Sequence, residues 1–145
     1  METLENVLKY WEKDSEIDQT EPSREIIRIP ILHSKYLNIL TNHRIASKKA
    51  AFDLARTKRT KYEYYSGKMS KEELDALGWE PFRFTLKSDI TTYLESDADI
   101  IKLLEKKAYH DEVIEVCMSI MKELGNRTFQ LREHMTMERF ISGGR

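Results

Sequence analysis

Apolar side chains recur at helical spacing near the N-terminus. Leu4, Val7, Leu8 and Trp11 follow the i, i+3, i+4, i+7 pattern that places side chains on one face of a helix. This pattern predicts a short amphipathic helix over residues 2–16, with an outer face that is mostly acidic.

The segment that follows lacks this periodicity. Residues 18–30 contain Pro22 and Pro30, which flank the apolar residues 26–29. Because a residue before proline favours an extended backbone, we expect a linker with a short extended apolar stretch.

A long helix is predicted next. From about residue 32 to residue 66 the chain has no Pro or Gly and is rich in strong helix formers. Gly67 fits the position just beyond a helix C-terminus. The apolar positions of this helix are sparse, so we expect other helices or other subunits to support it.

The middle of the chain predicts smaller elements. Residues 70–80 fit a short helical turn. Apolar and polar residues then alternate over 82–87, and a second apolar stretch follows at 90–94. This arrangement is compatible with a small β-hairpin, which is marginal unless something packs on it.

Two helices are predicted at the C-terminal end. Ser96 and Asp99 have the spacing of a helix cap, and apolar residues recur at helical spacing over 100–124. We expect Gly125 to end this helix and a last helix to span about residues 127–141.

These elements predict a mainly α-helical fold, with one long helix, shorter helices, room for a small β-hairpin, and assembly as a homo-oligomer. A chain of 145 residues fits one domain, and with 34% charged residues it buries only a modest core without copies of itself. Within a single domain over 1–145 we expect an acidic helix and linker at residues 1–30 and a long basic helix at residues 31–67. An irregular or hairpin segment should follow at residues 68–97, and C-terminal helices for oligomerisation at residues 98–145.

Charge is distributed unevenly although it nearly cancels to a net −1. Residues 42–71 hold nine bases against two acids, a local charge of +7, and lie between the acidic segments 1–25 and 72–115. Two interpretations of the basic segment remain open. It is a solvated helix face paired with acidic neighbours, or a polyanion site where Lys and Arg displace the counterions of phosphates.

Several function classes lack their motifs. No pair of glycines has the spacing of a phosphate-binding loop, which excludes a P-loop ATPase. The four histidines are dispersed and the lone Cys117 lies on an apolar helix face, so we assign no metal site and no cofactor. Asp97 and Asp99 suit a helix start better than acid–base catalysis, and no catalytic residue is assigned.

The cellular setting follows from two further features. A single cysteine cannot form an internal disulfide, which favours the reducing cytoplasm. No apolar run approaches the roughly 20 residues that a membrane-spanning helix needs, so we expect no membrane partner.

A basic–aromatic motif is the most informative stretch. Lys58, Lys61, Tyr62 and Tyr65 lie at i, i+3, i+4 and i+7 and form one stripe on a helix. Single-stranded nucleic acid is bound by this combination, since cations follow the phosphates and rings stack on bases. The alternative is that the tyrosines are core residues whose hydroxyls reach the surface.

The sequence resembles the UvsY family, the recombination mediators of T-even and related phages. The resemblance rests on Leu-His-Ser-Lys-Tyr-Leu-Asn at 32–38 and Arg-Thr-Lys-Tyr-Glu-Tyr-Tyr-Ser-Gly at 59–67, and continues at 87–89 and 94–99. It covers roughly residues 30–140.

The resemblance implies a non-enzymatic accessory protein of homologous recombination in the cytoplasm of the infected bacterial host. Such a mediator binds single-stranded DNA, forms a homo-oligomer, expected here to be a ring, and contacts the phage recombinase and the phage single-strand-binding protein. It promotes loading of the recombinase onto strand coated by the binding protein. The alternative is a structural or adaptor protein that forms a helical homo-oligomer and has no nucleic-acid role.

The resemblance also points to individual residues. In the family motif two basic residues, one position apart, precede Tyr-Tyr-Ser-Gly and serve DNA binding, and Arg59 and Lys61 occupy these positions with Arg and Lys swapped. We expect the DNA-binding residues to be the bases and two tyrosines of the basic segment: Arg44, Lys48, Lys49, Arg56, Lys58, Arg59, Lys61, Tyr62, Tyr65 and Lys68.

Overall fold

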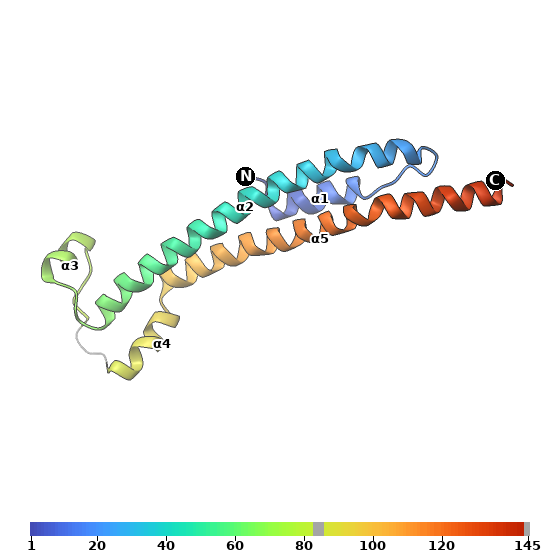
Figure 1. Ribbon diagram of the computed structural model, residues 1–145. Coiled ribbons are helices and arrows are strands. Elements are labelled where there is room, and N and C mark those ends of the chain that lie inside the picture. Colours follow the sequence, from blue (N-terminus) through green and yellow to red (C-terminus); the bar gives the residue numbers. More distant parts are fainter. Residues whose placement is uncertain (83–85, 144–145) are drawn as a thin grey trace. The chain divides into compact units, whose positions relative to one another are not determined.

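A computed structural model describes residues 1–82 and 86–143, and it confirms the mainly α-helical fold (Figure 1). The regular elements of these residues are α1 (Leu4–Asp14), α2 (Pro22–Tyr65), α3 (Lys71–Leu77), the 3-10 helix η1 (Lys87–Asp89), α4 (Ile90–Glu95) and α5 (Ala98–Ile141). They form two compact units, to which α2 and α5 both contribute. The terminal unit comprises Met1–Ile45 and His110–Arg145, and the central unit comprises Ala46–Tyr109.

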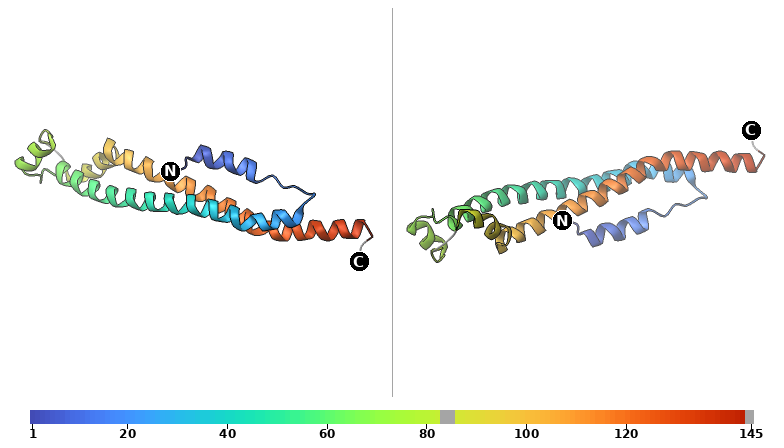
Figure 2. Two further views of the ribbon diagram at one scale, coloured as in Figure 1. Left: turned by 90° about the horizontal axis from the view of Figure 1, so that it is seen from above. Right: turned by 90° about the horizontal axis from the view of Figure 1, so that it is seen from below.

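The core of the terminal unit lies between α1, the first part of α2 and the last part of α5. Within this unit α1 runs alongside the two longer helices (Figures 1 and 2). The predicted amphipathic helix is thereby confirmed, with Val7 fully buried and Trp11 packed against the core. The buried residues of this core are Val7, Leu32, Tyr36, Ile39, Leu40, Val113, Cys117, Ile120 and Leu124.

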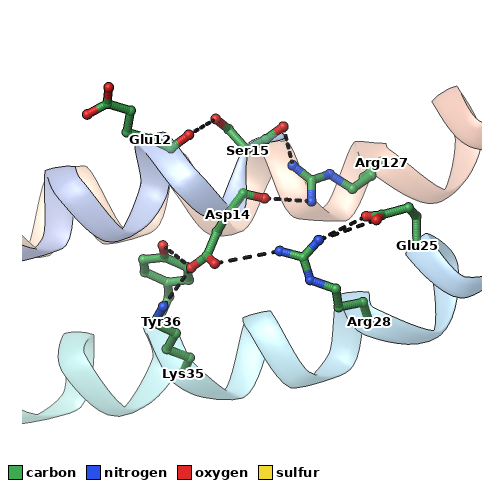
Figure 3. A network of polar contacts seen from close by, with 8 residues as sticks. All are labelled: Glu12, Asp14, Ser15, Glu25, Arg28, Lys35, Tyr36 and Arg127. Atoms are coloured by element: carbon green, nitrogen blue, oxygen red, sulfur yellow. Dashed lines mark hydrogen bonds and ion pairs between the residues drawn. The ribbon is translucent and has the colours of Figure 1, made fainter. Parts of the chain in front are cut away.

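A buried polar network fastens the end of α1 to the other two helices (Figure 3). The carboxylate of Asp14 accepts hydrogen bonds from Lys35 Nζ at 2.7 Å and from the Tyr36 hydroxyl at 2.8 Å. Arg127 of α5 is buried and donates to the backbone carbonyls of Asp14 and Ser15, at 3.2 and 3.4 Å. These bonds satisfy carbonyls that α1 leaves unpaired at its C-terminus.

The linker predicted for residues 18–30 is wrong beyond residue 21, because α2 begins at Pro22 and continues through Pro30. Pro22 occupies the first helical position, where a missing N–H costs nothing. Pro30 removes one internal helix bond. Leu32 and Tyr36 are buried in the turns that follow, and this packing holds the helix together.

The predicted division of the C-terminal helices is also wrong. One helix, α5, runs through Gly125 instead of ending there. Leu124 and Arg127 are buried on either side of the glycine, so packing offsets the low helix propensity of Gly. The cap is Asp97 instead of Ser96, since its Oδ1 accepts the N–H groups of Asp99 at 2.9 Å and Ile100 at 3.1 Å.

The central unit carries the short elements between the two long helices (Figure 1). Gly67 and Gly78 have positive φ, of 74° and 71°, just beyond α2 and α3, which confirms the predicted helix stop and the helical turn over 70–80. The hairpin is wrong in its second strand, because residues 90–94 belong to α4. The first predicted strand includes residues 83–85, which lie outside the described part of the chain.

Candidate nucleic-acid interface

The basic residues of α2 in the central unit lie mainly on the side that faces water. Because an α-helix repeats every 3.6 residues, Lys48, Phe52 and Arg59 fall on one side of the helix, at i, i+4 and i+11. All three are exposed, whereas Ala50 and Leu54 on the other side are buried. The helix therefore separates a packed side from a basic side.

Eight of the ten predicted DNA-binding residues are exposed, and the other two, Lys61 and Tyr65, are partly buried. Arg44 belongs to the terminal unit, where its Nη2 lies 3.9 Å from Sδ of Met118. The exposed members within the central unit are Lys48, Lys49, Arg56, Lys58, Arg59, Tyr62 and Lys68.

The exposed bases are only weakly neutralised. Arg56 pairs with Asp53, and Arg59 Nε lies 3.5 Å from Glu63 Oε1, while the two arginine side chains are 78% and 85% exposed. Such surface pairs contribute only a few tenths of a kcal/mol and exchange easily for another anion. Among the residues that the structure describes, none places a carboxylate within ion-pairing distance of Lys48, Lys49 or Lys58.

Lys61 has a different environment from the other bases. Its Nζ lies 3.1 Å from Asp97 Oδ2 and 2.8 Å from Asp99 Oδ2, and its side chain is only 12% exposed. The ammonium also lies 4.5 Å from the ring centre of Trp79, within cation–π range. The start of α5 therefore holds Lys61 in a compact ionic cluster.

The ionisation of this cluster is set by its hydrogen bonds. Burial lowers the pKa of Lys61, but the bonds to Asp99 and Asp97 outweigh it, and the net pKa is raised. Burial raises the pKa of Asp97, but bonds from the Tyr65 hydroxyl, the Ile100 N–H and Lys61 outweigh it and lower the pKa. Lys61 and Asp97 thus stay ionised at neutral pH.

Tyr65 packs into an aromatic cluster. Its ring centre lies 5.1 Å from that of Phe82 and 5.5 Å from that of Tyr93, and its hydroxyl donates to Asp97 Oδ2 at 2.6 Å. Burial and this hydrogen bond raise the pKa of Tyr65 above its usual range. Of the two interpretations of the tyrosines, this environment favours the packed one for Tyr65.

Tyr62 lies on the water-facing side and is 39% exposed. The ammonium of Lys68 lies 5.7 Å from its ring centre. Tyr62 therefore keeps part of its ring available beside an exposed base, which is the arrangement expected of a stacking residue.

Sequence reasoning missed two features of this region. It placed Asp97 and Asp99 at a helix start but did not pair them with Lys61, since nothing local links positions so far apart in the chain. It treated Phe52 as a sparse apolar position of the helix, although the side chain is 67% exposed. Its spacing from Lys48 and Arg56, four residues on either side, was the available signal.

Residues 1–82 and 86–143 contain no group of three His, Cys, Asp or Glu side chains placed to hold a metal ion. No helix among them is long and apolar enough to cross a membrane.

Comparisons with known proteins agree over nearly the whole chain. Residues 10–144 match the family described as "Recombination, repair and ssDNA binding protein UvsY". The recombination protein uvsY of Enterobacteria phage T4 is 26% identical over 143 residues, which cover 97% of this chain and 98% of the phage protein.

Solved structures show the same fold. A crystal structure of the bacteriophage T4 recombination mediator protein UvsY, in lattice type II, matches with a TM-score of 0.84 at 22% identity, over 98% of this chain and 99% of that one. A second structure of that protein, in lattice type IV, matches with a TM-score of 0.79 at 20% identity, over 96% and 98% of the two chains.

Proposed function

The chain belongs to the UvsY family of recombination, repair and single-stranded-DNA-binding proteins, and we propose that it binds single-stranded DNA through the basic side of α2 in the central unit. The observation that carries this proposal is the exposure of Lys48, Lys49, Lys58 and Arg59, three of which have no carboxylate partner among the described residues. Bases in this state neutralise phosphates and release their counterions at little cost to the fold.

The two predicted contact residues that are partly buried, Lys61 and Tyr65, have a structural role in this proposal. Lys61 and Tyr65 are committed to Asp97, and Lys61 also to Asp99. A phosphate would have to displace two carboxylates from Lys61 at once. We therefore assign Lys61 and Tyr65 to positioning α2 against the start of α5, so that the neighbouring exposed bases keep a fixed spacing.

The protein acts in this proposal as a non-catalytic mediator. It binds strand that is coated by the phage single-strand-binding protein and promotes loading of the phage recombinase there, in the cytoplasm of the infected bacterial host. The relative in phage T4 is called a recombination mediator, which supports this role.

Self-association strengthens the binding in this proposal. A homo-oligomer, arranged as a ring, repeats the basic side in each subunit, and several modest sites on one strand gain from effective concentration without new contacts. The oligomer bends or wraps the strand, which weakens the grip of the binding protein. Exposed apolar side chains on the last turns of α5, Phe140 and Ile141 among them, favour assembly.

Fluorescence anisotropy of a labelled oligonucleotide over a salt series tests the DNA-binding part. The logarithm of the affinity should fall linearly with the logarithm of the salt concentration, with a slope of about −0.7 for each phosphate neutralised on a single strand. Replacing Lys48 and Lys49 together by Ala should flatten this slope.

The matched control removes two other exposed lysines of the central unit, Lys102 and Lys106 on α5, which should leave the slope unchanged. Light scattering on the same samples reports assembly. If the unmodified protein assembles but binds no strand at low salt, it is a structural or adaptor protein and the proposal is wrong. If the control pair flattens the slope equally, the site is not on α2.

A further inference from the structure

Phe52 is an exposed aromatic side chain within the basic side of α2. Its side chain is 67% exposed, and it makes no ring contact with another described residue. By contrast, Leu54 two positions later is buried. Phe52 therefore adds nothing to the core of the central unit and presents its ring to water.

Four basic side chains lie on the same side of α2 as this ring. Lys48 and Lys49 precede Phe52 by four and three residues, and Arg56 and Arg59 follow it by four and seven. Side chains three or four residues apart lie beside one another on a helix surface, and Arg59, seven residues away, lies two turns further along the same side. All four bases are exposed, and the nearest acid on the helix, Asp53, is engaged with Arg56.

A lone exposed apolar residue has no special meaning in most proteins. Here the charge around the ring selects the occupant. A second apolar surface would have to desolvate several ammonium and guanidinium groups to cover Phe52, whereas a nucleotide places an anion against those groups and a flat base against the ring.

We propose that Phe52 is a base-stacking residue for single-stranded DNA. The lysines that precede Phe52 and the arginines that follow it hold the phosphates on either side of the stacked nucleobase. This inference rests on the proposed function and identifies the residue that contacts the nucleobases of the strand. Stacking does not depend on base identity, because every base has a π-face. The site therefore takes unpaired strand of any sequence.

Phe52 suits this role better than the motif tyrosines. Tyr65 already contacts the rings of Phe82 and Tyr93, and its hydroxyl is bonded to Asp97. Tyr62 is 39% exposed against 67% for Phe52. A base that stacks on Phe52 displaces only water, and it leaves the aromatic cluster of the central unit intact.

The test compares three substitutions on two kinds of strand. Phe52→Ala removes the ring, Phe52→Leu keeps apolar volume without a π-face, and Phe52→Tyr keeps the ring. Each full-length variant is titrated with a labelled oligothymidylate and with an abasic strand that has the same length and phosphates. Leu77→Ala, which removes another exposed apolar side chain of the central unit, is the matched control.

We expect Phe52→Ala and Phe52→Leu to bind oligothymidylate at least fivefold more weakly, and Phe52→Tyr and Leu77→Ala to bind as the unmodified protein does. On the abasic strand all of these variants should bind equally, with an unchanged salt slope. An equal loss for Phe52→Ala on both strands, or no loss on either, overturns the stacking role while leaving DNA binding by the protein established.

Two further outcomes are distinguishable. If Phe52→Ala lowers the mass measured by light scattering, Phe52 is a contact between copies of the chain and the inference is wrong. If the unmodified protein binds neither strand at low salt, the proposed function fails, and the stacking role fails with it.

Discussion

Substitution of Lys61 separates residues that hold the fold from residues that bind DNA. Lys61→Met keeps an unbranched side chain of nearly the same length but removes its charge from between Asp97 and Asp99. Arg59→Ala removes the other motif base, whose side chain is 85% exposed. The two positions are two residues apart, so a purely sequence-based view expects similar effects from both substitutions.

The structure predicts unequal costs in stability. Removing one partner of a fully buried ion pair costs about 3–5 kcal/mol. Asp97 keeps hydrogen bonds from the Tyr65 hydroxyl and from two backbone N–H groups, so we expect a smaller loss of about 1–3 kcal/mol. Each kcal/mol of lost stability should lower the melting temperature by roughly 2–4 °C. Arg59→Ala should stay within about 0.5 kcal/mol, because it breaks only a surface pair with Glu63.

DNA binding should show the reverse order. With binding measured well below the melting temperature of each variant, Arg59→Ala should reduce the magnitude of the salt slope by about 0.7 for each subunit that contacts the strand. Lys61→Met should leave the slope unchanged. The control is Asp99→Asn, since the Asp99 side chain is 63% exposed and its loss should change stability little.

The opposite result would refute this reasoning. The refuting result is that Lys61→Met melts at the same temperature as the unmodified protein and reduces the magnitude of the salt slope as much as Arg59→Ala does. Lys61 would then leave the two carboxylates and contact phosphate itself. The ionic cluster would then compete with DNA instead of positioning the helix.

Two more predictions concern stability alone. Burial raises the pKa of Asp14, but the bonds from Lys35 and Tyr36 outweigh it and lower the pKa, so its contribution to stability is present above the unfolded pKa of about 3.9 and is lost as the pH falls through the folded pKa. Urea midpoints measured from pH 6 to pH 2.5 should therefore fall less steeply for Asp14→Asn than for the unmodified protein, and equal slopes would contradict the assignment. Gly125→Ala should raise the free energy of unfolding by about 0.5–1 kcal/mol, because an added Cβ meets no atom within 4 Å in the middle of α5. A lower thermal midpoint for Gly125→Ala would show that the glycine is needed for a close contact.

Elements defined by local periodicity could be predicted from the sequence. The spacing of Val7 and Trp11 predicted α1, and the absence of helix breakers predicted α2 from residue 32 onward. The breakers themselves misled the prediction at Pro30 and Gly125. Each costs a helix a few kcal/mol or less, and the burial of neighbouring side chains offsets that cost.

Contacts between distant positions could not be predicted in the same way. The pairing of Lys61 with Asp97 depends on how α2 and α5 pack in the central unit, and no local pattern encodes it. The sequence correctly placed basic and aromatic residues together. It did not show which of these residues are held in packed or ion-paired contacts within the central unit.

The basic–aromatic stripe of the sequence lies at the boundary between the packed and the open side of α2. Lys61 and Tyr65 face the start of α5, while Lys58 and Tyr62 face water. A stripe that straddles this boundary cannot bind a strand along its whole length without dismantling the cluster that fixes the helix. The side that remains open runs through Phe52 instead, and its basic side chains have no buried ion-pair partners. We therefore expect the exposed basic side chains near Phe52 to determine the affinity for single-stranded DNA, and Lys61 to determine the stability of the central unit.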